Sequence, residues 1–76
     1  MYWVYALKSR AQKYIYVGMT NDIDRRVAEH NTSREKTTRT YAPFKLIYSE
    51  IVEDRTRARK REKYLKSGIG KEFLKN

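Results

Sequence analysis

The polar residues that stand out as candidates for chemistry lie in two stretches with helical periodicity. Within residues 22–31, Ile23 and Val27 mark an apolar stripe one helical turn apart. At helical spacing, Arg26 and His30 fall on that same face. A small domain rarely turns an arginine and a histidine toward its sheet without giving them partners. These two residues are therefore the first candidates for a functional site.

The second stretch, residues 54–67, repeats this pattern with the opposite charge. Ala58 and Leu65 mark its buried stripe, and Glu62 lies between them. An inward carboxylate requires a cation or hydrogen-bond donors. Spacing leaves two interpretations open. One is a buried salt bridge between Arg26 and Glu62, and the other is a cleft where the carboxylate holds a hard cation and the arginine meets a phosphate.

Three strands must position these helices. Residues 2–7 are apolar on both faces, which is typical of a central or covered strand. A short polar connection leads to a second strand at residues 14–19, so we expect an antiparallel hairpin. A third strand begins at Pro43 and continues to about Val52, since proline is tolerated at the start of a strand.

The second strand should present its aromatic residues on one side. Tyr14, Tyr16 and Gly18 share one face, because side chains alternate along a strand. Gly18 ends the run at a point where the chain can turn or another group can approach closely. Asn21 is a good N-cap for the helix that follows.

Two further helices complete the expected order. Asp54 caps a helix that runs to about Ser67, and Gly68 favours a stop there. A short final helix over residues 71–75 should dock Phe73 and Leu74 on the core. The sequence thus predicts an α+β fold in the order β-β-α-β-α-α, with a small three-stranded antiparallel sheet flanked by helices.

The stretch 32–42 has no periodicity and is polar, basic and rich in threonine, which predicts a loop. Loops on a rigid scaffold often carry binding residues. Lys36, Arg39 and Tyr41 are the candidates here for contacting a nucleic-acid backbone or stacking on a base. The equally weighted alternative is that this loop only connects two elements and faces solvent.

Composition indicates the class of partner. The chain of 76 residues forms one domain, residues 1–76, and carries a net charge of +9 from 18 Lys and Arg against 9 Asp and Glu. Such an excess suggests a polyanion, with nucleic acid favoured over a membrane surface. There is no cysteine, so disulfides and thiolate metal sites are excluded. No apolar run spans a bilayer and no leader pattern opens the chain, so we expect a soluble, cytoplasmic protein.

The polar candidates and the strands together match a known pattern. The tripeptides Trp3-Val4-Tyr5 and Tyr16-Val17-Gly18 stand at a fitting separation, and Arg26 follows the second tyrosine by ten positions. His30 comes four residues later, and Glu62 lies on a later helix. In this combination the sequence resembles the GIY-YIG nuclease superfamily, and within it the small stand-alone single-domain branch.

Family members hydrolyse phosphodiester bonds with one divalent cation. The resemblance therefore implies a metal-dependent DNA endonuclease of weak sequence specificity, with branched or single-stranded DNA as preferred structures and a role in repair or recombination. By similarity, Glu62 would bind Mg²⁺ or Mn²⁺ and Arg26 would pair with the scissile phosphate. Tyr5 would activate the attacking water, directly or with help from His30, and Tyr16 would orient the water or the phosphate.

Other interpretations of these residues stay open at this point. Tyr5 and Tyr16 are also consistent with sheet packing, and His30 with a bond to a backbone carbonyl at the helix end. Met19 occupies a position where some members have lysine, and Trp3 replaces the first glycine. The alternative function is a nucleic-acid-binding module with little or no turnover. A domain that docks on another protein through its basic face is a third.

Overall fold

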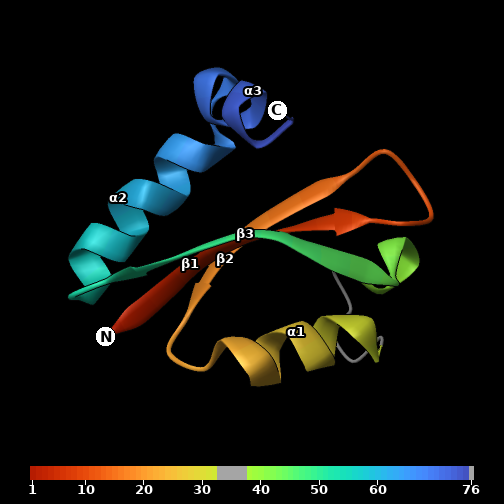
Figure 1. Ribbon diagram of the computed structural model, residues 1–76, viewed down its shortest axis with the longest axis horizontal. Coiled ribbons are helices and arrows are strands. Elements are labelled where there is room, and N and C mark those ends of the chain that lie inside the picture. Colours follow the sequence, from red (N-terminus) through yellow and green to blue (C-terminus); the bar gives the residue numbers. More distant parts are fainter. Residues whose placement is uncertain (33–37, 76) are drawn as a thin grey trace.

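The chain folds into a three-stranded antiparallel sheet with helices on both faces (Figure 1). The computed structural model describes residues 1–32 and 38–75. The predicted α+β class and element order are confirmed. The elements are β1 (Tyr2–Ser9), β2 (Ile15–Thr20), α1 (Ile23–Asn31), the 3₁₀ helix η1 (Arg39–Tyr41), β3 (Phe44–Val52), α2 (Arg55–Lys66) and α3 (Gly68–Lys75).

Strand β1 lies between the other two, in the order β2-β1-β3. Both pairings are antiparallel, and Tyr5 lies opposite Gly18 on one side and Ser49 on the other. A central strand with helices on both faces is buried on both faces, which explains the apolar run at residues 2–7. Strands β2 and β3 form the two edges of the sheet.

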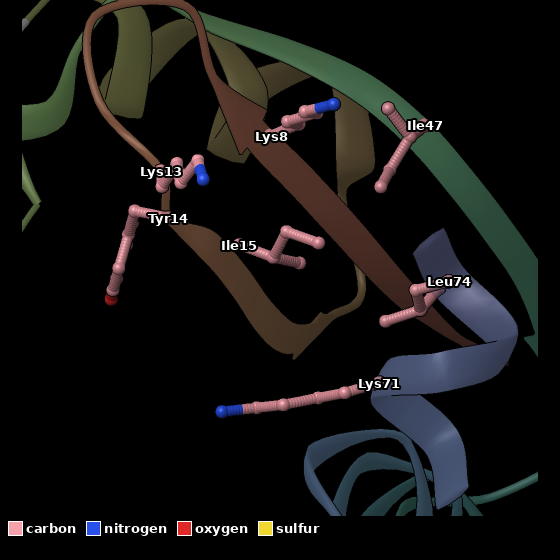
Figure 2. Close-up of a pocket in the computed structure, with 7 residues that line it drawn as sticks. All are labelled: Lys8, Lys13, Tyr14, Ile15, Ile47, Lys71 and Leu74. Carbon is pink, nitrogen blue, oxygen red and sulfur yellow. The ribbon is translucent and has the colours of Figure 1, made fainter. Parts of the chain in front are cut away.

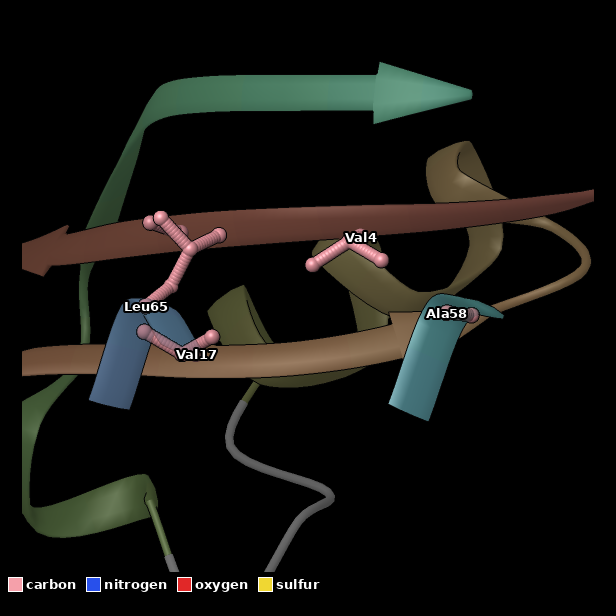
Figure 3. Packing of buried hydrophobic residues seen from close by; sticks show 5 residues of the cluster. Val4, Val17, Ala58 and Leu65 are labelled. Carbon is pink, nitrogen blue, oxygen red and sulfur yellow. The ribbon is translucent and has the colours of Figure 1, made fainter. Parts of the chain in front are cut away.

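Alternation along β1 divides the core into two clusters. Val4 and Ala6 face α2, where they pack with Val17 of β2 and with Ala58 and Leu65 of the helix (Figure 3). The other face of the sheet carries aromatic and aliphatic residues beneath α1, and Tyr5, Leu7 and Phe44 are its buried members. The helices α1 and α2 therefore lie on opposite faces of the sheet (Figure 1).

Side chains at the starts of α1 and α2 accept hydrogen bonds from backbone N–H groups of the first helical turn. The carboxylate of Asp22 accepts a hydrogen bond from the N–H of Arg25 at 3.2 Å, so Asp22 is the N-cap of α1. The prediction that Asn21 caps this helix is wrong by one residue, because α1 begins at Ile23. Asp54 caps α2 as predicted, and its carboxylate accepts from the N–H of Arg57 at 2.8 Å.

Helix α3 begins three residues earlier than the sequence suggested. Gly68 does not end the helical run, because Ser67 separates α2 from α3 and its backbone oxygen accepts from the N–H of Lys71 at 2.9 Å. Leu74 packs on the core as predicted. Phe73 does not dock there, since it is 51% exposed and contacts only the edge of the Tyr48 ring among the aromatic residues described.

Candidate active site

Four of the predicted site residues gather on the α1 face of the sheet. Tyr5 comes from β1, Tyr16 from β2, and Arg26 and His30 from α1. The ring centroids of Tyr16 and His30 are 4.7 Å apart, and the Tyr5 hydroxyl lies 3.3 Å from Nε2 of His30. The Tyr5 hydroxyl also hydrogen-bonds to Arg26 and to Tyr16. The hairpin and the first helix thus place two phenols, one guanidinium and one imidazole in direct contact.

Gly18 makes room for this cluster. A Cβ atom at this position would lie 2.8 Å from the Tyr5 hydroxyl oxygen and 2.8 Å from a ring carbon of Tyr16. Both distances are too short for any side chain, so only glycine admits the two tyrosines as they lie. The close approach of another group, which the sequence suggested at Gly18, is confirmed.

The members of the cluster differ in their access to solvent. Tyr5 and His30 have no exposed surface. Tyr16 is half-buried, and the Arg26 side chain is 26% exposed and forms an ion pair with Glu29 at 2.8 Å. A substrate that approaches this face therefore meets Tyr16 and Arg26 first, with Tyr5 and His30 behind them.

Burial and neighbouring charges set the protonation of the cluster. Burial raises the pKa of Tyr5 to about 12, and proximity to Tyr16 adds to the rise, whereas the hydrogen bond from Arg26 opposes it. Burial lowers the pKa of Arg26, but the hydrogen bonds to Glu29 and Tyr5 outweigh this effect and raise the pKa overall. At neutral pH, Tyr5 is therefore a neutral phenol beside a charged guanidinium.

Glu62 lies on α2, next to the residue that ties this helix to β3. The preceding residue, Arg61, forms two hydrogen bonds of 2.8 Å to the carboxylate of Glu50 on β3. This bidentate pair fixes the rotation of α2 over the sheet. Glu62 follows Arg61 by one residue, so it lies about 100° further around α2 than this pair. Its side chain is 22% exposed and pairs with Nζ of Lys66 at 3.2 Å.

The salt bridge between Arg26 and Glu62, one of the two interpretations that spacing left open, is not among the ion pairs of the described residues. Arg26 forms its ion pair with Glu29 in α1, and Glu62 forms its own with Lys66 in α2. The alternation of β1 side chains requires this arrangement. The tyrosine face carries α1, and the opposite face, with Val4 and Ala6, carries α2.

A hollow lies along β2, beside α2 and α3. It has a volume of about 290 Å³, and we call it the edge hollow. Tyr16, from the tyrosine cluster, and Lys66, the partner of Glu62, both line it. One member of the cluster and the lysine that pairs with Glu62 therefore line the same hollow. The residues that line the edge hollow are Tyr14, Ile15, Tyr16, Val17, Lys66 and Lys71.

A larger groove of about 790 Å³ adjoins the edge hollow, and we call it the lysine groove. Figure 2 shows Lys8 and Lys13 on the hairpin side and Lys71 on the α3 side. Among the described residues, those that line the two hollows include no carboxylate. No periodicity links these lysines, so the sequence did not predict that they lie together. The lysine groove is lined by Lys8, Lys13, Tyr14, Ile15, Ile47, Lys71 and Leu74.

The three loop residues expected to contact nucleic acid have different outcomes. Lys36 lies outside the described residues. The backbone of Arg39 begins η1. Tyr41 stacks on Tyr14 with a centroid distance of 3.9 Å and an angle of 15°, so one face of its ring is already covered. A base could stack on Tyr41 only from its other face.

The donor set at Glu62 suits one kind of metal ion. Among residues 1–32 and 38–75, no group of three or more His, Cys, Asp or Glu side chains could enclose a metal. Mg²⁺ keeps several waters and commonly binds through one or two carboxylates together with substrate phosphates. The partly exposed carboxylate of Glu62 fits an ion held mainly by water and substrate. It does not fit a closed protein cage.

The family model of the GIY-YIG catalytic domain matches residues 1–75. The chain belongs to the GIY-YIG family. The predicted resemblance is confirmed, and the family is a nuclease family. Across the described residues, none of the helices of this GIY-YIG domain combines the length and apolar character that a membrane span requires.

The relatives of this GIY-YIG chain are small UPF0213 proteins. A UPF0213 protein of Clostridium perfringens is 39% identical over 67 residues, which cover 87% of this chain and 71% of the relative. One from Desulfotalea psychrophila is 38% identical over 66 residues, covering 84% of this chain and 60% of the relative. The NMR structure of a UPF0213 protein from Bacillus halodurans matches with a TM-score of 0.57 and 32% sequence identity. The match covers 97% of this chain and 82% of the Bacillus halodurans chain. None of these names states a reaction.

Proposed function

We propose that this GIY-YIG domain is a metal-dependent endonuclease that hydrolyses DNA phosphodiester bonds with weak sequence specificity, and that it serves DNA repair or recombination in the cytoplasm. The observation that carries the proposal is the convergence of Tyr5, Tyr16, Arg26 and His30 on one sheet face, beside the edge hollow that Lys66 also lines. The net charge of +9 supports a polyanionic substrate.

Arg26 and Tyr16 are the members of the cluster that can reach a substrate. In the proposed reaction the Arg26 guanidinium pairs with the non-bridging oxygens of the scissile phosphate, on which negative charge accumulates in the transition state. Its hydrogen bond to Glu29 holds the guanidinium at this position before the substrate binds. The Tyr16 oxygen accepts a hydrogen bond from the attacking water and so orients that water toward phosphorus.

Tyr5 takes up a proton from the attacking water by way of Tyr16. The water oxygen bonds to phosphorus while the bond to the leaving oxygen breaks, and the leaving oxygen takes a proton from solvent. The proton of the water passes to the Tyr16 oxygen as the Tyr16 proton passes to a deprotonated Tyr5. Because burial raises the pKa of Tyr5 to about 12, its phenolate needs the donors around its oxygen, Arg26 among them.

Glu62 is the residue of this chain that would hold the divalent cation, Mg²⁺ or Mn²⁺. When bound, the cation would polarise the phosphate and stabilise the leaving oxygen. The chain prepares the carboxylate in two ways. The Arg61–Glu50 pair fixes the rotation of α2, and the Lys66 ammonium, which lines the edge hollow, pairs with the Glu62 carboxylate at 3.2 Å.

Cleavage of defined DNA substrates tests the proposal. We expect nicking of supercoiled plasmid, or cleavage of branched or single-stranded DNA, in Mg²⁺ or Mn²⁺ and none in EDTA. Absence of cleavage of every substrate in both metals would reject the endonuclease. Salt-dependent DNA binding without turnover would instead support the binding module, which the methionine at position 19 favours because some members have lysine there.

The lysine groove gives a prediction about how the flanking nucleic acid is held. Replacement of Lys8, Lys13 and Lys71 with glutamine should weaken DNA binding in EDTA. We expect the plot of log affinity against log salt to become shallower by about two to three units, because each lost phosphate contact removes about 0.7–0.9. Fluorescence anisotropy at several salt concentrations measures this slope.

The matched control removes the same charge from the outer side of α2. Arg59, Lys60 and Lys63 are all exposed and line neither hollow. Their replacement with glutamine should leave most of the slope intact. Equal decreases of the slope in the two triple variants would show that DNA binding depends on net charge alone. The lysine groove would then hold no DNA.

A further inference from the structure

A buried threonine lies behind the tyrosine cluster. Thr38 has no exposed surface, and its hydroxyl oxygen lies 2.7 Å from Nδ1 of His30. The other ring nitrogen of His30 faces the Tyr5 hydroxyl at 3.3 Å. Both ring nitrogens of this single histidine are thus engaged by hydroxyl groups. Each hydroxyl can donate or accept, so the direction of both hydrogen bonds depends on the tautomer of the ring.

The proton of Thr38 decides between the two tautomers. Within the described residues, His30 is the only side-chain partner that the structure gives the Thr38 hydroxyl. If Nδ1 carried the proton, Thr38 could only accept, and its own proton would be buried without an acceptor. If Nδ1 is unprotonated, Thr38 donates to it. A buried, unpartnered donor is costly, so the second arrangement is favoured.

The remaining protons follow from this choice. With Nδ1 as an acceptor, a neutral ring carries its proton on Nε2 and donates it to the Tyr5 oxygen. Tyr5 then donates to Tyr16, to which it also hydrogen-bonds. Thr38, His30 and Tyr5 therefore each donate to the next group in this series, which runs from buried Thr38 to half-buried Tyr16.

We infer that Thr38 is a positioning residue, which holds His30 in the Nε2–H tautomer so that the imidazole donates a hydrogen bond to the Tyr5 oxygen. This inference rests on the proposed function for its catalytic meaning, but the tautomer itself does not depend on it. A donor aimed at the Tyr5 oxygen stabilises the phenolate that the proposed reaction requires. His30 therefore supports Tyr5 as a donor, and does not take its proton.

The chain contains a single histidine, so its ring is the only source of signals in long-range ¹H–¹⁵N spectra of protein labelled in histidine. At a pH above the titration of the ring, we expect a protonated Nε2 and an unprotonated Nδ1 in the wild type. Thr38→Val removes the hydroxyl at nearly constant shape and should shift population toward the Nδ1–H form. Thr38→Ser should restore the wild-type pattern.

Activity provides the second measurement. Thr38→Val should lower kcat for DNA cleavage about ten- to hundredfold, which is typical for loss of a group that orients a catalytic side chain, with KM unchanged. Thr38→Ser should recover most of the rate. Thr40→Val is the matched control, since Thr40 lies in the same 3₁₀ turn but is exposed.

Three outcomes would overturn the inference. A wild type with its proton on Nδ1 would do so, even if the valine variant failed to fold. A Thr38→Val variant that keeps the wild-type spectrum and rate would also do so, and so would a Thr40→Val variant with an equal loss. If the wild type cleaves no DNA, the proposed function fails, and the spectra still decide the tautomer.

Discussion

Glu62→Gln is expected to reduce metal-dependent DNA cleavage by at least about 10³-fold, because a bound cation contributes several kcal/mol to transition-state stabilisation and each 1.4 kcal/mol is tenfold in rate. Glutamine keeps the shape of the side chain and an oxygen for Lys66 but loses the charge that attracts a divalent cation. Single-turnover cleavage across a series of Mg²⁺ and Mn²⁺ concentrations measures the effect. We expect the residual activity to require far more metal.

The fold should survive this change. Glu62 forms an i,i+4 pair at the helix surface, and such pairs contribute about 0.3–0.5 kcal/mol, so the Tm should change little. Glu53→Gln is the matched control, since the Glu53 side chain is 81% exposed and pairs with Arg57 in the same way. A Glu62→Gln variant with normal rate and normal metal dependence would remove this glutamate from the site.

Arg26→Lys is expected to lower kcat about 10²–10³-fold, the usual loss when one preorganised donor to a developing oxyanion is removed. Lysine keeps the positive charge but lacks the planar fork that can meet Glu29, Tyr5 and a phosphate together. DNA affinity in EDTA should remain within about twofold, because the net charge is unchanged. Cleavage rates and anisotropy measured on one substrate separate these two effects.

The pH dependence of the residual activity adds an independent test. The hydrogen bond from Arg26 lowers the pKa of Tyr5 against the rise caused by burial. Loss of this bond should raise that pKa further, so the rise of rate with pH should move to higher pH in Arg26→Lys. Arg25→Lys is the control, since Arg25 is the exposed neighbour, with a 4.0 Å pair to Asp22. An equal loss in both variants would contradict a specific role for Arg26.

Local patterns were enough to predict most of the cluster. Period-two alternation placed Tyr16 and Gly18 on one face of β2, and the structure confirms it. Helical spacing placed Arg26 and His30 on the inner face of α1, where the structure has them. The sequence also predicted that the Glu62 carboxylate turns inward, and its side chain is 22% exposed in the structure. Each inference concerns residues within one element, where backbone geometry fixes which side chains share a face.

Local sequence patterns could not predict how the helices and strands pack against one another. Helical spacing turns Glu62 toward the sheet but does not say which face of the sheet α2 covers, so it left open whether Glu62 pairs with Arg26. Packing decides the matter. Val4 and Ala6 offer α2 an aliphatic surface, whereas Tyr5 occupies the other face with its hydroxyl in a polar cluster.

The sequence of this protein determined its strands, its helices and the residues that each element turns inward, because these depend on propensity and periodicity over a few neighbouring residues. Tertiary structure alone brought Thr38 to His30, placed Lys66 beside Tyr16, and gathered Lys8, Lys13 and Lys71 around one groove. These groups are separated along the chain and share no period. Their proximity arises only when the hydrophobic faces of separate elements are buried together.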